Sequence, residues 1–101
     1  MLDREQILNY LSANKAYFTS KYYVDKIGIT GSFSRGDYTK NSDIDIVVFF
    51  NKEAKNNRIF RLYINLQEEL EKHFHRNIDI IVNGKVLPAF QDKVLKETQY
   101  V

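Results

Sequence analysis

The stretch that decides the fold spans residues 31–45 and reads Gly-Ser-Phe-Ser-Arg-Gly-Asp-Tyr-Thr-Lys-Asn-Ser-Asp-Ile-Asp. Gly31 and Ser32 follow an apolar run that ends at Thr30, and Asp43 and Asp45 open a second apolar run that extends to residue 50. Ten residues separate Ser32 from Asp43. Short apolar runs bounded by turn residues are typical of buried strands. The stretch therefore predicts a Gly-Ser turn at the end of one strand, facing two carboxylates on the next.

The spacing of the two carboxylates indicates a metal site. Residues i and i+2 of a strand point to the same face, roughly 6.5–7 Å apart at the backbone, so Asp43 and Asp45 can converge on metals about 3.5–4 Å apart, as in two-metal transfer sites. Mg²⁺ is usually bound by one or two carboxylates, with phosphates and water as its other ligands. A lone Asp-x-Asp pair more often consists of solvated acids. Here the neighbours are Ile and Val, where two unscreened charges cost free energy.

The residues around the turn suit a phosphate. Gly31 lets the backbone approach a ligand closely, and Ser32 offers a hydroxyl. We expect a short helix over residues 32–36 whose first amides face an anion. Arg35 has two open interpretations, a contact to phosphate or an ion pair with an acid such as Asp37. The polar segment 37–42 predicts a loop.

A third carboxylate, Asp79, lies within the apolar segment 77–82, which predicts a strand. Ile78, Ile80 and Val82 would share one face and Asp79 the other. The functional interpretation is that Asp79 completes the metal site and accepts the proton of an attacking hydroxyl. The alternative is an acid paired with a Lys or Arg.

Taken together, Gly31-Ser32, the ten-residue spacing and Asp43-Ile-Asp45 resemble the signature of the DNA-polymerase-beta-like nucleotidyltransferase superfamily. More narrowly, the chain resembles the minimal (MNT-type) nucleotidyltransferases, the antitoxins of HEPN–MNT toxin–antitoxin pairs. The resemblance covers nearly the whole chain and includes residues 34–36, Ser42 and residues 78–82. Thr30 departs from the pattern, since many relatives have an aromatic residue there. The resemblance implies the nucleotidyltransferase fold, a small mixed β-sheet flanked by helices.

The resemblance also implies an activity, namely Mg²⁺-dependent transfer of AMP from ATP to a hydroxyl, with release of pyrophosphate. Asp43, Asp45 and Asp79 would be the catalytic and metal-binding residues, and the nucleotide phosphates would be bound by Gly31, Ser32, Arg35 and Ser42. The implied partner is a cognate HEPN ribonuclease toxin, modified on a tyrosine. Two alternatives stay open: an antitoxin that binds its toxin stoichiometrically through a non-catalytic site, and a stand-alone transferase for a small hydroxylated molecule such as an aminoglycoside.

The rest of the chain predicts an α/β (α+β) domain in which helices alternate with strands. Helices are expected over residues 3–13, with Asp3 near the N-cap, over about 57–75, and from Pro88 onward; residues 24–30 predict the first strand. His73 and His75 are two apart on a helix, a poor spacing for shared ligation, so they are expected to be solvated. The long helix should bury one stripe, formed by Ile59, Tyr63, Leu66, Leu70 and Phe74. Its solvent side should carry Glu68, Glu69, Glu71 and Lys72. The last helix should pack onto the sheet through Phe90, Val94 and Leu95.

Length and composition set the remaining limits. The 101 residues predict one domain, residues 1–101. The absence of cysteine excludes a disulfide or a thiolate metal site. A net charge of +2 with interleaved signs does not favour direct nucleic-acid binding. Neither a signal peptide nor an 18-residue apolar span is visible, so we expect a cytoplasmic protein that does not bind membranes.

Overall fold

A four-stranded mixed sheet forms the centre of the protein. The computed structural model describes residues 2–101, with Asn56 by its backbone only, and within this part the strand order is β3-β2-β1-β4. β1 (Val24–Thr30) and β2 (Ile44–Phe50) are antiparallel, β3 (Ile78–Val82) is parallel to β2, and β4 (Gln99–Tyr100) is antiparallel to β1. The expected α/β class with a small mixed sheet is confirmed.

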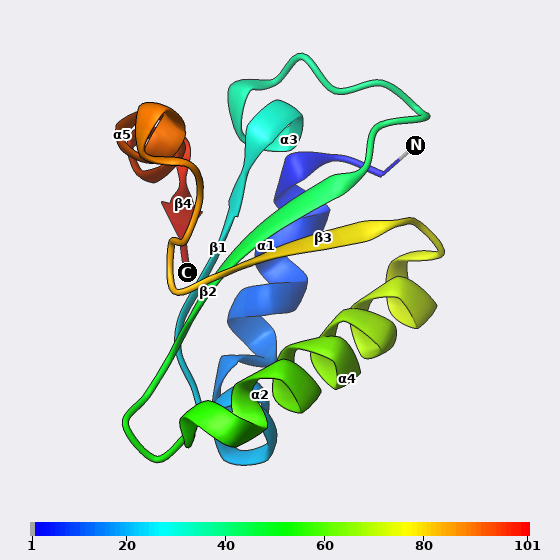
Figure 1. Cartoon of the computed structure of the whole chain (residues 1–101). Helices are drawn as coiled ribbons and strands as arrows, with labels where there is room; N and C mark the ends of the chain where they lie inside the picture. Colours follow the sequence, from blue (N-terminus) through cyan, green and yellow to red (C-terminus); the bar gives the residue numbers. More distant parts are fainter. Residues whose placement is uncertain (1) are drawn as a thin grey trace.

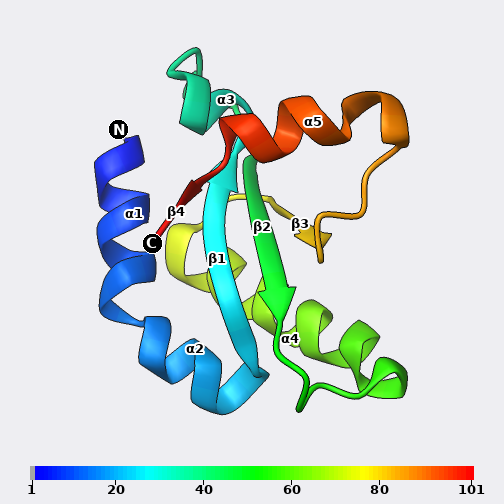
Figure 2. The ribbon, with the colours of Figure 1, turned by 90° about the vertical axis from the view of Figure 1, so that its left-hand side faces the viewer.

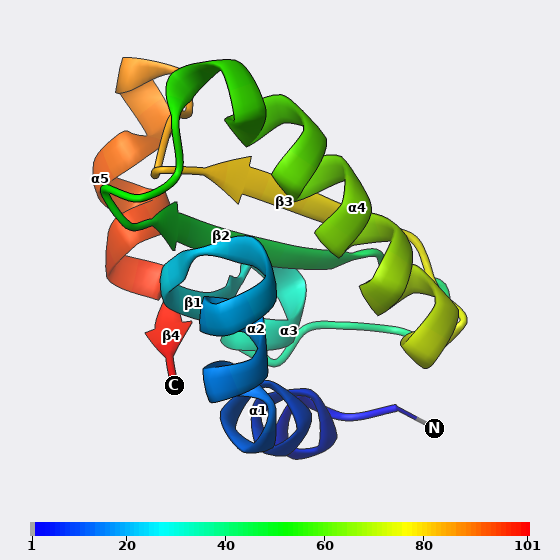
Figure 3. The ribbon, with the colours of Figure 1, turned by 90° about the horizontal axis from the view of Figure 1, so that it is seen from below.

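Helices cover the two faces of the sheet unequally. Three of them, α1 (Arg4–Ala13), α2 (Lys15–Tyr22) and α4 (Asn56–Phe74), lie on one face (Figures 1 and 3). The short α3 (Gly31–Arg35) follows β1 directly, and α5 (Pro88–Glu97) crosses the same end of the sheet (Figure 2). No helix of the described residues 2–101 is both long and apolar enough to span a membrane.

Alternation along β2 decides which face becomes the core. Ile44, Ile46 and Val48 point toward α1, α2 and α4 and are fully buried. Asp45 and Val47 point to the other face, as the period of two requires. The core cluster is completed by residues of the helices and the neighbouring strands: Ile7, Leu11, Phe18, Tyr22, Val24, Ile27, Ile29, Phe33, Leu66, Leu70 and Ile78. The predicted inward faces of β2 and β3 therefore agree with the structure.

Local sequence explains where the first helix begins and where the longest helix ends. Asp3 caps α1 through a capping box, in which its side chain accepts from the Gln6 N–H and the Gln6 side chain accepts from the Asp3 N–H, both at 2.9 Å. α4 ends at Phe74, and its C-cap His75 adopts a left-handed conformation with φ 53°. His75 is exposed and His73 stacks on Tyr10 with ring centroids 3.6 Å apart, so the two histidines do not share a site.

Two glutamates of α4 that were expected on the solvent side make internal contacts instead. Glu69 Oε1 accepts hydrogen bonds from the hydroxyls of Tyr17 at 2.8 Å and Tyr22 at 2.6 Å. Burial and the neighbouring Glu69 charge raise the pKa of Tyr22 to about 12. Glu71 Oε2 accepts from the Ile78 N–H at 3.2 Å. The expectation was wrong because α2 and the start of β3 approach α4 from parts of the chain distant in sequence.

The C-terminal region differs most from expectation. Residues 99–100 form β4, which the sequence did not predict, and α5 buries none of its residues. Phe90 is 55% exposed and Leu95 36% exposed, so the predicted packing of this helix onto the sheet is wrong. Polar contacts hold α5 instead: the Ser34 hydroxyl donates to the Glu97 carbonyl, and the Thr30 hydroxyl donates to the Val94 carbonyl at 3.3 Å.

The close approach of β4 to β1 depends on Gly28. A Cβ at this position would lie 2.5 Å from the Gln99 carbonyl oxygen. We expect Gly28→Ala to destabilise the fold by about 1–3 kcal/mol, because the added methyl displaces β4. In amide hydrogen exchange, the Val101 N–H, which donates to Ile27 at 3.0 Å, should lose protection. The Asn51 N–H, which donates to the Tyr23 carbonyl next to the other end of β1, should keep its protection. Equal protection of the Val101 N–H in wild type and variant would contradict the prediction.

Candidate functional site

The register of the sheet places Asp45 between Thr30 of β1 and Asp79 of β3. Thr30 is the antiparallel partner of Asp45, and Asp79 is its parallel partner. The three side chains therefore form one row across the face of the sheet that lies away from the main core. Asp45 is half-buried and Asp79 is exposed. Asp43 was expected on the strand itself, but it lies one residue before β2 and is exposed.

The Gly-Ser turn lies directly against this row. Gly31 has φ +70°, and a Cβ there would overlap Asp45 Oδ2. Glycine is thus required twice, for its left-handed backbone and for the space that the carboxylate occupies. Ser32 is half-buried in the first turn of α3, and its carbonyl accepts from the Gly36 N–H at 2.9 Å. The expected short helix is present, with Gly36 (φ 93°) as its C-cap.

Asp45 carries the strongest electrostatic perturbation among the acids of the site. Burial raises its pKa, and the neighbouring charges of Asp79 and then Asp43 raise it further, to about 6. The guanidinium of Arg35 acts in the opposite direction. Asp79 and Asp43 therefore lie close enough to Asp45 for their charges to disfavour its ionised form. A partly desolvated carboxyl whose pKa is raised by two like charges is typical of functional sites.

Arg35 makes the ion pair that was one of the two interpretations left open by the sequence. Its Nε lies 3.2 Å from Asp37 Oδ2, so the predicted acid pairing is present. Its Nη1 lies 3.2 Å from Glu97 Oε2 of α5, a partner that the sequence did not indicate. Both contacts raise the pKa of the guanidinium, and Asp37 has the larger effect. Arg35 thus links α3 to α5 at the border of the site.

Ser42 lies at the end of the loop before β2 and is held by that loop. Its hydroxyl accepts from the Thr39 N–H at 2.8 Å, and its carbonyl accepts from Arg76 Nη1 at 3.1 Å. These contacts fix the chain immediately before Asp43. The hydroxyl of Ser42 therefore orders the loop in this structure.

A cavity of about 300 Å³ opens beside Asp45 and Gly31. α5 supplies one wall of it, including three residues that the sequence analysis did not assign to a site: Phe90 as an apolar surface, Lys93 as a cation and Glu97 as the partner of Arg35. Their spacing of three and four places them on one face of a helix. This periodicity could have identified the helix face in the sequence, but it does not reveal which part of the sheet that face meets.

The donor set fits a hard divalent cation. Within residues 2–101, no group of three or more His, Cys, Asp or Glu side chains is arranged as a ready-made metal centre. However, Asp45 is a half-buried oxygen donor whose charged form is disfavoured by Asp79 and Asp43. A cation bound among these acids would reverse that repulsion, and carboxylate oxygens are the ligands that Mg²⁺ prefers. The residues are therefore compatible with the predicted metal.

Sequence and structure comparisons show the family and the fold of the chain. The family described as nucleotidyltransferase domain matches residues 11–101. The whole chain is 31% identical to the protein adenylyltransferase MntA of Thermococcus cleftensis and covers 98% of that relative. A solved structure described as a candidate minimal nucleotidyltransferase superposes with a TM-score of 0.75 at 21% identity, over 97% of this chain and 95% of that chain. A crystal structure of a toxin–antitoxin with AMP-PNP gives a TM-score of 0.62 at 21% identity, over 98% and 72% of the two chains.

The raised pKa of Asp45 makes a prediction about stability. The pKa of Asp45 is about 6 in the folded protein and 3.8 in a model peptide. Between these pH values the folded state binds more protons than the unfolded state, so the stability that Asp45 contributes at low pH is lost as the pH rises through this window. In buffer with a chelator, Asp45→Asn should therefore raise the melting temperature by several degrees at pH 7.5 and by much less at pH 4.5. Asp25→Asn, at an exposed position of β1, is the control. An equal effect of Asp45→Asn at both pH values would contradict the prediction.

Proposed function

This chain belongs to the nucleotidyltransferase domain family, and we propose that it transfers AMP from ATP to a hydroxyl group of a partner toxin, as the antitoxin of the pair. The observation that carries the proposal is the row of Asp45 and Asp79 beside the Gly31 backbone. Carboxylates next to a close-approaching backbone suit a metal-bound triphosphate. MntA of T. cleftensis, a relative along the whole chain, is named for the same transfer to a protein.

The bonds formed and broken in the proposed transfer balance. The acceptor oxygen attacks the α-phosphorus of ATP, a new P–O bond forms, the bond to the β-phosphate oxygen breaks, and pyrophosphate leaves. Asp79, exposed on the edge strand β3, accepts the proton of the acceptor hydroxyl. Asp43 and Asp45, with Asp79, would hold Mg²⁺, which supplies charge neutralisation at the phosphates. Gly31 and Ser32 border the phosphates, and Ser42 holds the preceding loop.

The cavity under α5 is the place for the nucleotide in this proposal. Asp45 and Gly31 line it together with Phe90 and Lys93 of α5. Among the ion pairs of the described residues, Arg35 engages two carboxylates and Lys93 takes part in none. We therefore assign the main phosphate contact to Lys93, with Arg35 as the residue that positions α5. An ammonium group is a common phosphate ligand, and Phe90 offers an aromatic face for the base.

A protein acceptor is supported by the whole-length match to an adenylyltransferase that acts on proteins. The toxin–antitoxin structure with AMP-PNP has the same fold, and that fold supports a similar pairing here. On the resemblance stated above, the acceptor would be a tyrosine of a HEPN ribonuclease. A purely stoichiometric antitoxin would not need the repelling carboxylates, which cost stability without a cation.

The first test is direct transfer. Incubation with labelled ATP, Mg²⁺ and the product of the neighbouring gene should label that product, and Asp43→Ala combined with Asp45→Ala should reduce labelling at least about a hundredfold. Toxin activity should be suppressed at substoichiometric ratios and only when ATP is present. Rescue at a strict one-to-one ratio without ATP would instead show a binding antitoxin.

The second test separates the phosphate contact from the metal site. Loss of a charge-assisted hydrogen bond in Lys93→Ala should raise KM for ATP by about 10- to 100-fold, with a smaller change in kcat. Lys96→Ala is the matched control, because Lys96 is an exposed lysine of the same helix that does not line the cavity. Calorimetric titration with a non-hydrolysable ATP analogue should show the same difference in affinity. Equal affinities of both variants would remove Lys93 from the site.

A further inference from the structure

The outer edge of β3 carries main-chain groups that face away from the sheet. β3 is the terminal strand of the order β3-β2-β1-β4. The Ile44 N–H donates to the Asn77 carbonyl at 3.0 Å, and the Asn83 N–H donates to the Val48 carbonyl at 2.7 Å. Odd-numbered residues therefore bond inward to β2, and in a parallel ladder the even-numbered ones face outward.

Four of these outward groups are open to an added strand. The Ile78 N–H is bonded to Glu71, and the Val82 carbonyl accepts from the Lys85 N–H at 3.0 Å. For the Ile78 carbonyl, the Ile80 N–H, the Ile80 carbonyl and the Val82 N–H, the described part of the chain supplies no such partner. Open edge groups of this kind accept an extended segment of another chain by strand addition.

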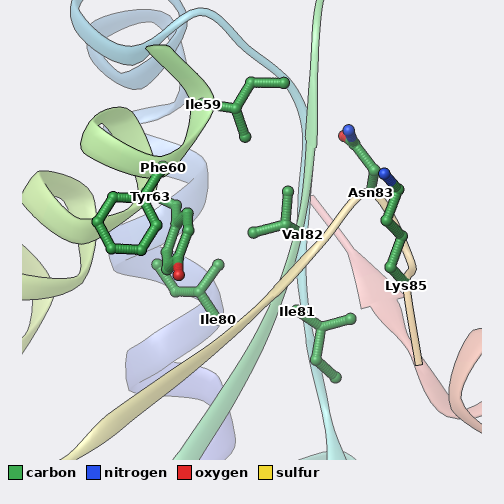
Figure 4. Close-up of a pocket in the computed structure, with 8 residues that line it drawn as sticks. All are labelled: Ile59, Phe60, Tyr63, Ile80, Ile81, Val82, Asn83 and Lys85. Carbon is green, nitrogen blue, oxygen red and sulfur yellow. The ribbon is translucent and has the colours of Figure 1, made fainter. Parts of the chain in front are cut away.

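An apolar groove of about 550 Å³ follows the same edge. Figure 4 shows Phe60 and Tyr63 of α4 on the side of Ile80 and Val82, with Ile81 on the opposite side of β3. Because the groove is lined by residues from both faces of β3, it lies along the edge rather than on either face. Phe60 is 68% exposed, so it is available to an incoming side chain.

The groove shares a lining residue with the cavity proposed for the nucleotide. Ile81 lines both the edge groove and the cavity that contains Asp45. In addition, the row from Thr30 through Asp45 to Asp79 would continue into the added strand. The residue opposite Asp79 would project on the same face, with its Cα about 4.5–5.5 Å away. A hydroxyl at that position would meet the carboxylate that is proposed to accept its proton.

We propose that the β3 edge is the docking site of the acceptor: an extended segment of the partner protein adds to the sheet as a strand and presents a hydroxyl-bearing residue opposite Asp79. This inference rests on the proposed function. Apolar side chains of the segment contact Phe60 and Tyr63. The charged residue of the groove lining is Lys85, so the far end of the segment carries an acidic residue. Pairing of β3 with the β3 strand of a second copy would not serve the transfer, since β3 itself (Ile-Asp-Ile-Ile-Val) has no hydroxyl to offer.

The test uses the synthetic peptide acetyl-Glu-Glu-Val-Gln-Val-Tyr-Gly-amide, whose antiparallel register sets Tyr opposite Asp79 and Glu near Lys85. NMR titration should show saturable shifts at the Ile80 and Val82 amides. Val82→Pro removes one outward N–H while sparing the ladder to β2 and should weaken binding at least tenfold. Val82→Ala, which keeps the N–H, should weaken it much less.

Lys85→Glu keeps the test decisive if the proline variant does not fold. This surface change should weaken binding of the acidic peptide severalfold and favour a peptide with Lys in place of Glu. Peptide binding at β3 without transfer of AMP to its tyrosine would support the docking site and count against the proposed function. The docking site would be overturned by absence of binding, by shifts confined to residues outside β3, α4 and the segment 83–85, or by self-association through β3 in sedimentation. Transfer that is equal in wild type and Val82→Pro would also overturn it.

Discussion

Repulsion among the carboxylates around Asp45 is the constraint on which the arrangement of this protein depends. Asp45 points away from the core on a strand whose alternate residues are fully buried. Its position therefore cannot change without moving Ile44 and Ile46 out of the core. The strand holds the acid half-buried beside Asp79, where its pKa rises to about 6. The stability of the core thus maintains a local arrangement of charges that is unfavourable by itself.

The two ends of the site are held by different kinds of contact. On the β2–β3 side, the parallel register fixes Asp45 against Asp79 through the backbone ladder. On the α5 side, the helix has no buried residue of its own. The helix is held by Arg35–Glu97, by the Ser34 hydroxyl and by the Thr30 hydroxyl. Exposed and partly exposed polar contacts of this kind are individually weak, so the nucleotide wall is more easily displaced than the acid row. Such a difference would suit the proposed binding and release of a nucleotide.

Thr30 illustrates how one departure from a family pattern has a structural role. Its hydroxyl donates to the Val94 carbonyl of α5 at 3.3 Å, and Thr30 itself is buried. A side chain without a hydroxyl at this position could not make this contact. The position before the Gly-Ser turn therefore contributes here to the attachment of the C-terminal helix as well as to the packing of β1.

The sequence by itself determined most of the helices and strands and the inward faces of β2 and β3, because those depend on local periodicity, capping and turn residues. It predicted β1 over residues 24–30, the alternation of β2 and β3, the Asp3 cap of α1 and the short helix after Gly31. It also specified the three acids as candidates, although their roles stay proposals. Only the tertiary structure decided the contacts made between distant segments. The fourth strand at residues 99–100, the pairing of Arg35 with Glu97, the cavity with Phe90 and Lys93, and the open edge of β3 all depend on strand order and on the path of α5. Two-residue strands and surface helices carry too little periodic signal to reveal which segment they will meet.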